Sequence, residues 1–201
     1  MDVLSILENI ETESYTRKEL VCLSKHSDGE VRLRALEELM NTCENFPSLR
    51  LLEGLKDDDV LVRVLCLEEL GDQGNEAHFC SIYQLIEDNE ALVRAAAIVA
   101  LGQTGSKDDI RRISTIVPQT EAEQLAKRVA LYIISDSRYL DGIIHFFNSP
   151  DYHIRCSVAN QLSQFAKKSD KSLIIHALKT QLVKEKARSV QSSLMNALNE
   201  L

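Results

Sequence analysis

The side chains best suited to chemistry in this sequence are its 31 carboxylates, 5 histidines and 5 cysteines. His153 and Cys156 are three residues apart, so on a helix they would share one face and could both reach a metal ion. A stable metal site needs three or four protein ligands, and no third ligand is evident nearby. We therefore interpret this pair as incidental and predict no metal site. The cysteines also lack the paired spacing of a disulfide framework, and we expect them to be buried, reduced thiols.

Catalytic motifs are missing as well. Asp72 and His78 could serve as a base and an acid, but a lone pair of this kind is common by chance. The sequence contains no glycine-rich phosphate loop, no Gly-x-Ser-x-Gly elbow and no DNA-binding motif. We therefore predict no catalytic residue, no cofactor and no small-molecule substrate, and we expect the chain not to be an enzyme.

A repeated segment determines where the side chains lie. Residues 31–39, 62–70 and 93–101 superimpose, and each begins with Val-Arg, 31 residues after the one before. Weaker copies begin at Ala126, Ile154 and Val190. Within each copy the apolar residues occupy positions 0, 4, 5 and 8, which is the spacing of one helix face and not the alternation of a strand. Each copy is therefore predicted to be a helix.

Start signals and a second periodic segment complete each unit. Carboxylates precede the helices at Asp28, at residues 57–59 and at Asp88, where they can accept from the free N–H groups of a first turn. Another apolar stripe lies between successive copies, for example at Leu49, Leu52 and Leu55. Each unit is thus helix, turn, helix, and neighbouring units must stack to bury their apolar faces.

This pattern, an acidic cap followed by Val-Arg-x-x-Ala-x-x-x-Leu-Gly-x-x-Gly, resembles HEAT repeats, in the short bacterial form also seen in phycobilin-lyase-like proteins. The resemblance implies an all-α, right-handed α-solenoid of about six stacked helical hairpins, curved with a concave face. We expect a single domain, 1–201, with an N-terminal capping helix at 1–13. The expected repeats are 15–40, 46–71, 75–103, 106–135, 137–167 and 169–201.

The resemblance also implies a role for the basic residue that follows the first apolar position. In the family this arginine usually bonds to an acidic residue of an adjacent hairpin and so locks one repeat to the next. The matching positions form the expected structural ladder of Arg32, Arg63, Arg94, Lys127 and Arg155. HEAT-like hydroxylases carry His-Glu dipeptides and HEAT-like DNA glycosylases need a basic face, whereas no histidine here precedes a glutamate and the net charge is −8.

Charge is unevenly distributed along the chain. Residues 1–100 have a balance of −12 and residues 101–201 a balance of +4. Two pairs of glutamates stand in register, and with the nearby aspartates they form a predicted acidic strip for binding a basic protein. Its members are Glu37, Glu38, Glu68, Glu69, Asp57, Asp58 and Asp59. The alternative is that these carboxylates are only a solvated helix face, since glutamate is a good helix former.

These patterns favour a protein-binding adaptor or inhibitor over an enzyme. Two alternatives remain: a bacterial immunity protein that neutralises a toxin, and a bilin-lyase-like or other HEAT-fold enzyme. Binding of nucleic acid is not expected, because the lysines after Lys167 are scattered without interleaved aromatic residues. With no secretion signal and no long apolar run, we expect a cytoplasmic chain that does not contact a membrane.

Overall fold

The computed structural model describes residues 2–12, 15–42 and 46–201, and every regular element in these ranges is a helix. The chain divides into two compact units, Met1–Ala100 and Leu101–Leu201. The helices that begin in the first unit are α1 (Val3–Glu11), α2 (Arg17–Leu23), α3 (Gly29–Asn41), α4 (Ser48–Gly54), α5 (Val60–Gln73), α6 (Phe79–Tyr83) and α7 (Ala91–Thr104). Those of the second are α8 (Ile110–Thr115), α9 (Glu121–Ile134), α10 (Leu140–Ile144), α11 (Tyr152–Gln164), α12 (Lys171–Lys184) and α13 (Arg188–Glu200).

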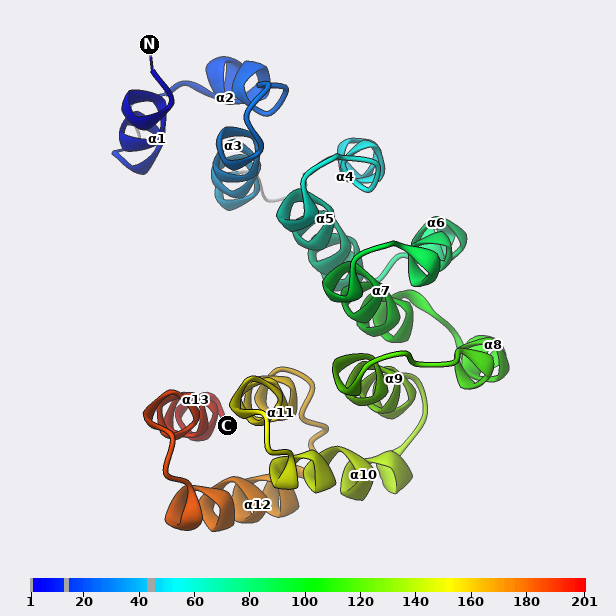
Figure 1. Ribbon diagram of the computed structural model, residues 1–201. Coiled ribbons are helices and arrows are strands. Elements are labelled where there is room, and N and C mark those ends of the chain that lie inside the picture. Colours follow the sequence, from blue (N-terminus) through cyan, green and yellow to red (C-terminus); the bar gives the residue numbers. More distant parts are fainter. Residues whose placement is uncertain (1, 13–14, 43–45) are drawn as a thin grey trace. The chain divides into compact units, whose positions relative to one another are not determined.

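Short 3-10 helices extend several of these elements. They are η1 (Glu76–His78), η2 (Gln84–Glu87), η3 (Lys107–Asp109), η4 (Ser137–Tyr139) and η5 (His145–Asn148). After α1 the helices form pairs, and within each unit a pair consists of two helices joined by a turn, as Figure 1 shows for α2 with α3 and for α12 with α13. The chain is therefore an α-solenoid of helical hairpins.

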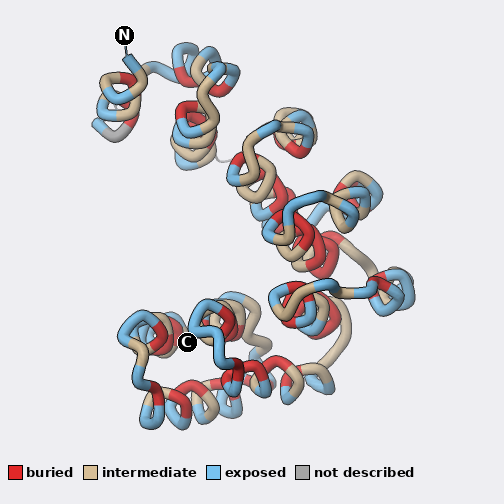
Figure 2. The backbone as a smooth tube through the Cα atoms, in the orientation of Figure 1, coloured by how far each residue is buried: buried red, intermediate tan, exposed pale blue. Residues whose placement is uncertain are grey.

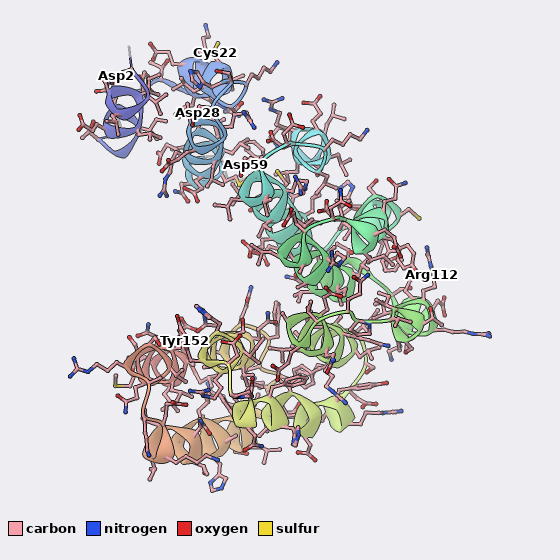
Figure 3. All side chains as sticks on the ribbon, in the orientation of Figure 1. Asp2, Cys22, Asp28, Asp59, Arg112 and Tyr152 are labelled. Carbon is pink, nitrogen blue, oxygen red and sulfur yellow. The ribbon has the colours of Figure 1, made fainter. Side chains whose placement is uncertain are left out.

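The second helices α3, α5 and α11 begin at aspartate caps. The carboxylate of Asp28 accepts hydrogen bonds from the N–H groups of Glu30 and Val31, at 3.0 and 3.2 Å. Asp59 does the same for the first turn of α5, at 2.8 and 3.3 Å. Figure 3 labels both caps. Each cap satisfies N–H groups that have no partner within the helix and places a negative charge at the positive end of the helix dipole.

Glycines play two different parts near the ends of these helices. Gly74 follows α5 with a φ of 60°, the left-handed conformation that favours glycine at a helix end. Gly102 lies inside α7, not at its end, and a Cβ on it would come within 2.5 Å of the Ala130 Cα in α9. Only a residue without a side chain permits that close approach.

The core lies at the positions that the repeat predicted. Figure 2 shows that the buried residues follow one side of each long helix. In α5, for example, Val62, Cys66, Leu67 and Leu70 are 0% exposed. The equivalent residues of α3, which are Val31, Ala35, Leu36 and Leu39, are also buried. None of the helices in the described ranges is long and apolar enough to span a membrane.

Candidate protein-binding surface

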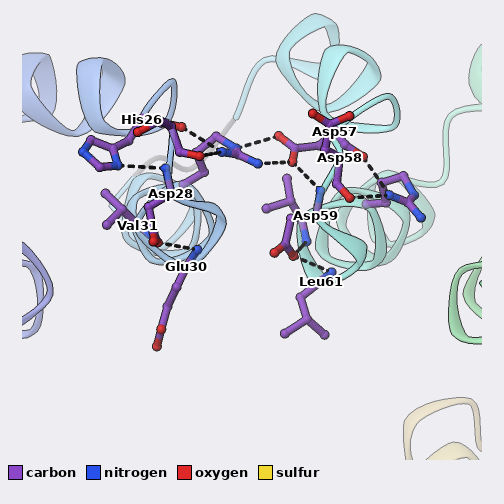
Figure 4. Close-up of polar contacts among 12 residues, drawn as sticks. His26, Asp28, Glu30, Val31, Asp57, Asp58, Asp59 and Leu61 are labelled. Atoms are coloured by element: carbon purple, nitrogen blue, oxygen red, sulfur yellow. Dashed lines mark hydrogen bonds and ion pairs between the residues drawn. The ribbon is translucent and has the colours of Figure 1, made fainter. Parts of the chain in front are cut away.

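Arginines in the second helices join successive turns of the first unit (Figure 4). Arg32 donates through Nε and one terminal nitrogen to the two carboxylate oxygens of Asp57, at 2.9 and 2.6 Å. Its other terminal nitrogen donates to the carbonyls of His26 and Ser27. The guanidinium thus spans from the turn before α3 to the turn before α5. A two-bond pair of this kind is among the stronger interactions of charged side chains.

A similar arrangement repeats one hairpin later, within the same compact unit. Arg63 donates to the carbonyls of Asp57 and Asp58 and, at 3.0 Å, to a carboxylate oxygen of Asp88. Arg94 in turn donates to the carbonyls of Asp88 and Asn89. Asp88 therefore accepts a hydrogen bond from Arg63 through its side chain and another from Arg94 through its backbone carbonyl.

In the second unit the arrangement holds for one position and differs at the other. Arg155 donates to both carboxylate oxygens of Glu185, at 2.8 and 3.0 Å, and to the carbonyls of Ser149 and Pro150. Lys127 donates to the carbonyls of Ser114 and Ile116 in its own hairpin. A lysine ammonium is a compact point charge without the fork of a guanidinium, so it holds one turn and does not reach into a second.

The aspartates of the predicted acidic strip are occupied by internal contacts. Besides its bonds from Arg32, Asp57 accepts from the N–H of Asp59. Burial raises the pKa of Asp57, but the hydrogen bonds from Arg32 and Asp59 outweigh it, so the pKa lies below its ordinary value. Asp59 caps α5, and Asp58 alone of the three is exposed. The structure therefore assigns Asp57 and Asp59 to holding the turn.

The four glutamates of the strip occupy two different faces. Glu37 and Glu68 lie at equivalent positions on the faces of α3 and α5 opposite the core, and Glu68 is exposed. Glu37 pairs with Arg34 at 2.9 Å in a solvent-exposed bridge. Glu38 and Glu69 lie one position further round, and Glu69 accepts from Gln73 at 3.2 Å. The exposed acidic face is therefore centred on Glu37 and Glu68.

One acidic residue outside the predicted strip belongs to this face. Asp72 is exposed and follows Glu68 by one helical turn. Partial burial, and then the negative charge of Asp72, raise the pKa of Glu68. Glu69 and Asp72 also line a hollow of about 640 Å³ beside the start of α4, together with Phe46, Pro47, Ser48, Gln73 and Asn75. The spacing of Glu68 and Asp72, four residues apart, could have identified this pair from the sequence.

Sequence reasoning also missed exposed leucines on the same face. Leu61 and Leu92 precede the repeated Val-Arg pairs of α5 and α7, and they are 52% and 53% exposed. Figure 4 shows Leu61 and Glu30 pointing to the same side of their helices, away from the aspartate turn. Glu30 holds the equivalent position in α3. The sequence signal for these exposed leucines is an apolar residue directly before the first core valine of the second and third repeats, where the first repeat has Glu30.

The histidines and cysteines are dispersed. Within the described ranges no group of three histidines, cysteines or carboxylates could hold a metal ion. The ring of His153 lies against that of Tyr152, 3.9 Å between centroids. Cys66 is buried, whereas Cys22 and Cys80 are exposed, so the expectation that the cysteines are all buried was wrong for these two. Cys22 lies on the outer side of α2 (Figure 3), and Cys43 falls outside the described residues.

Comparison with known proteins agrees with this architecture. Residues 48–133 match the family model of HEAT repeats. The search of curated proteins found no match. Among solved structures, the chain is similar to one in the complex of CpcE and CpcF of phycocyanin lyase from Nostoc sp. PCC7120. The two chains are 16% identical with a TM-score of 0.50, and the alignment covers 93% of this chain and 95% of the other. At that identity the likeness shows the fold alone.

The resemblance that the Val-Arg motif indicated is therefore confirmed: residues 48–133 match the family model of HEAT repeats, within an α-solenoid whose fold is similar to that of a chain in the phycocyanin lyase complex.

Proposed function

We propose that this chain is a non-catalytic protein-binding module, an adaptor or inhibitor that binds a basic partner through Glu37, Glu68 and Asp72. The observation that supports it is the pair Glu68 and Asp72, two carboxylates one turn apart on the face opposite the core. Their repulsion contributes to the raised pKa of Glu68, and a lysine or arginine from a partner would relieve it.

The charge of the first unit favours the same kind of partner. Residues 1–100 carry a balance of −12, and this range coincides with the first compact unit. A field of one sign accelerates encounter with an oppositely charged protein and selects against acidic ones. The two carboxylates that the turns use, Asp57 and Asp59, still contribute to the long-range field although they are unavailable for direct contact.

The test is a pull-down with matched charge variants. The bait Glu37→Lys with Glu68→Lys reverses two charges on the proposed face. The control Glu53→Lys with Glu76→Lys makes the same change in net charge at exposed positions elsewhere in the unit. We expect a stoichiometric basic partner to bind the wild type and the control and to be lost from the first bait. Equal retention by both variants would contradict the proposed face.

Two narrower versions make different predictions. An immunity protein that neutralises a toxin would form a tight one-to-one complex with a single partner. A bilin-handling chain is suggested by the full-length likeness to a phycocyanin lyase chain. Mixing the purified protein with a free bilin would then change the pigment's absorbance spectrum, and an unchanged spectrum would count against that version.

A further inference from the structure

An apolar patch adjoins the acidic face of the first unit. Its members occupy the outward positions of α5 and α7, spaced three or four residues apart, so each helix presents them on one face. They are Leu61 and Leu65 of α5, and Leu92, Ala96 and Val99 of α7. The two leading leucines are about half exposed, and the other three are partly exposed.

Polar contacts fix the two helices side by side at this end. Arg63, in the first turn of α5, pairs with Asp88, which precedes α7, and Arg94 of α7 donates to the carbonyl of the same aspartate. Leu61 and Leu92 lie two residues before these two arginines. The leucines therefore lie in the first turns of two helices whose N-terminal ends these bonds connect.

The patch has a charged border. At the equivalent positions of α3, which packs against α5, the sequence has Glu30, Arg34 and Glu37. Along α5 the patch gives way to Glu68 and Asp72. The surface is thus apolar over the first turns of α5 and over α7, and mainly acidic toward α3 and the end of α5. Exposed and partly exposed apolar side chains that are bordered by charges are typical of interaction sites.

We propose that this patch is the docking site for an amphipathic helix of the partner, whose apolar stripe covers the five residues and whose basic residues meet Glu37, Glu68 and Asp72. The inference deepens the proposed function and rests on it. A helix suits the site because its own side chains, spaced three and four residues apart, match the spacing of the patch residues along α5 and α7. Charge complementarity requires a basic flank and disfavours an anionic membrane, since the border is acidic.

The probe is a synthetic peptide of about 18 residues, five helical turns, with leucines on one helical face and lysines on the other, labelled with fluorescein. A scrambled peptide of the same composition has the same charge but no stripe, and a third peptide replaces lysine by glutamate. Anisotropy titrations with the full chain should give a Kd at least about tenfold tighter for the first peptide than for either control. Adding about 0.5 M salt should leave part of that preference over the scrambled peptide, because apolar contacts are not screened.

Two variants locate the site. Leu61→Ser with Leu92→Ser removes the two most exposed members of the patch, and Leu49→Ser with Val117→Ser removes exposed apolar residues elsewhere. We expect the first pair to weaken binding of the amphipathic peptide at least about tenfold and the second pair to leave it unchanged. All four substitutions are at exposed positions, and circular dichroism verifies that each variant is folded.

The outcomes separate this inference from the proposed function. If Glu37→Lys with Glu68→Lys weakens binding but the leucine variant does not, the docking site is wrong and the acidic face stands. If only the leucine variant matters, the acidic face is wrong. If neither matters, both are overturned. A dimer of the wild type in sedimentation that Leu61→Ser with Leu92→Ser abolishes, or binding to neutral vesicles that the same variant abolishes, would assign the patch to a different occupant and overturn the inference.

Discussion

Arg155 reaches Glu185, thirty residues later in the chain, and donates to both of its carboxylate oxygens. The side chains are 15% and 4% exposed. The carboxylate also accepts from the side chain of Gln181 and from the N–H groups of Lys186 and Ala187. One ion pair therefore fastens the turn before α11 to the turn before α13.

Removing one partner of this pair should be costly. We expect Arg155→Ala to lower the free energy of unfolding by about 3 kcal/mol, because it leaves Glu185 buried without its cation. Urea denaturation followed by circular dichroism measures the change. The control is Arg138→Ala, whose pair with Asp136 is 72% and 49% exposed and screened by solvent, and it should cost much less than Arg155→Ala. Equal losses in the free energy of unfolding for the two substitutions would show that burial does not strengthen the contribution of the Arg155–Glu185 pair.

The same carboxylate should make stability depend on pH in the acid range. Hydrogen bonds from Arg155, and further ones from Gln181 and two backbone N–H groups, lower the pKa of Glu185 from 4.5 to about 2. The folded state therefore favours the ionised form, and this contribution is complete above about pH 4.5 and is lost as the pH falls toward 2. Denaturation between about pH 2 and 7 should show that loss in the wild type. It should be shallower in Glu185→Gln, and an unchanged slope in that variant would refute the assignment.

Two acidic residues of the first unit should respond differently to loss of charge. Asp57→Asn removes the charged acceptor of Arg32 and should lower the free energy of unfolding by about 1.5–3 kcal/mol. Glu68 has a raised pKa, so the fold disfavours its ionised form at neutral pH. Because the Glu68 side chain is exposed, solvent screens this effect, and Glu68→Gln should leave stability unchanged or raise it slightly. Urea denaturation of both variants at about pH 7 tests the contrast, and a loss in Glu68→Gln comparable with that in Asp57→Asn would contradict it.

Two glycines should differ in their tolerance of alanine. A Cβ at Gly102 would meet the backbone of Ala130 at 2.5 Å, so α7 or α9 must shift. We expect Gly102→Ala to lower the free energy of unfolding by about 1–3 kcal/mol. At Gly142 the nearest atom is the flexible Arg128 guanidinium, which can move away. Gly142→Ala should then cost less than about 1 kcal/mol, and thermal denaturation of both proteins decides between these expectations.

Thiol labelling should report burial. Burial raises the pKa of the Cys66 thiol to about 12, so its reactive thiolate is scarce at neutral pH and its sulfur is inaccessible. In the folded protein, iodoacetamide should modify Cys22 and Cys80 within minutes and leave Cys66 unmodified until denaturant is added. Peptide mapping by mass spectrometry measures each site, and rapid labelling of Cys66 in the folded protein would contradict its position in the core.

The helices and their core faces were predictable because their signals are local. The apolar positions from Val62 to Leu70 and the cap at Asp59 can be read within one helix. The first helices of the later hairpins were less predictable in detail. Residues 76–87 form a five-residue α-helix between two 3-10 segments, and apolar spacing alone does not separate about 3.6 from about 3.0 residues per turn.

The candidate site was predictable only in part, since exposure depends on contacts far along the chain. Asp57 looks like any surface carboxylate until Arg32, 25 residues away, is seen to hold it. Glu68 and Glu69 are adjacent in sequence, but the second is bonded to Gln73 and the first lies opposite the core. The sequence placed charge on the correct helices, but it could not say which carboxylates the fold itself requires.

The shared aspartates also bear on how such a chain changes length. Arg32 and Arg63 each supply the connection to the hairpin that follows, and the turns at Asp57 and Asp88 receive the connection from the hairpin that precedes. A duplicated 31-residue segment would therefore arrive with a matching connector at both of its ends. Growth by duplication would need no new kind of contact between hairpins. Loss of a single residue between Arg63 and Asp88, by contrast, would shift the aspartate relative to the arginine that binds it.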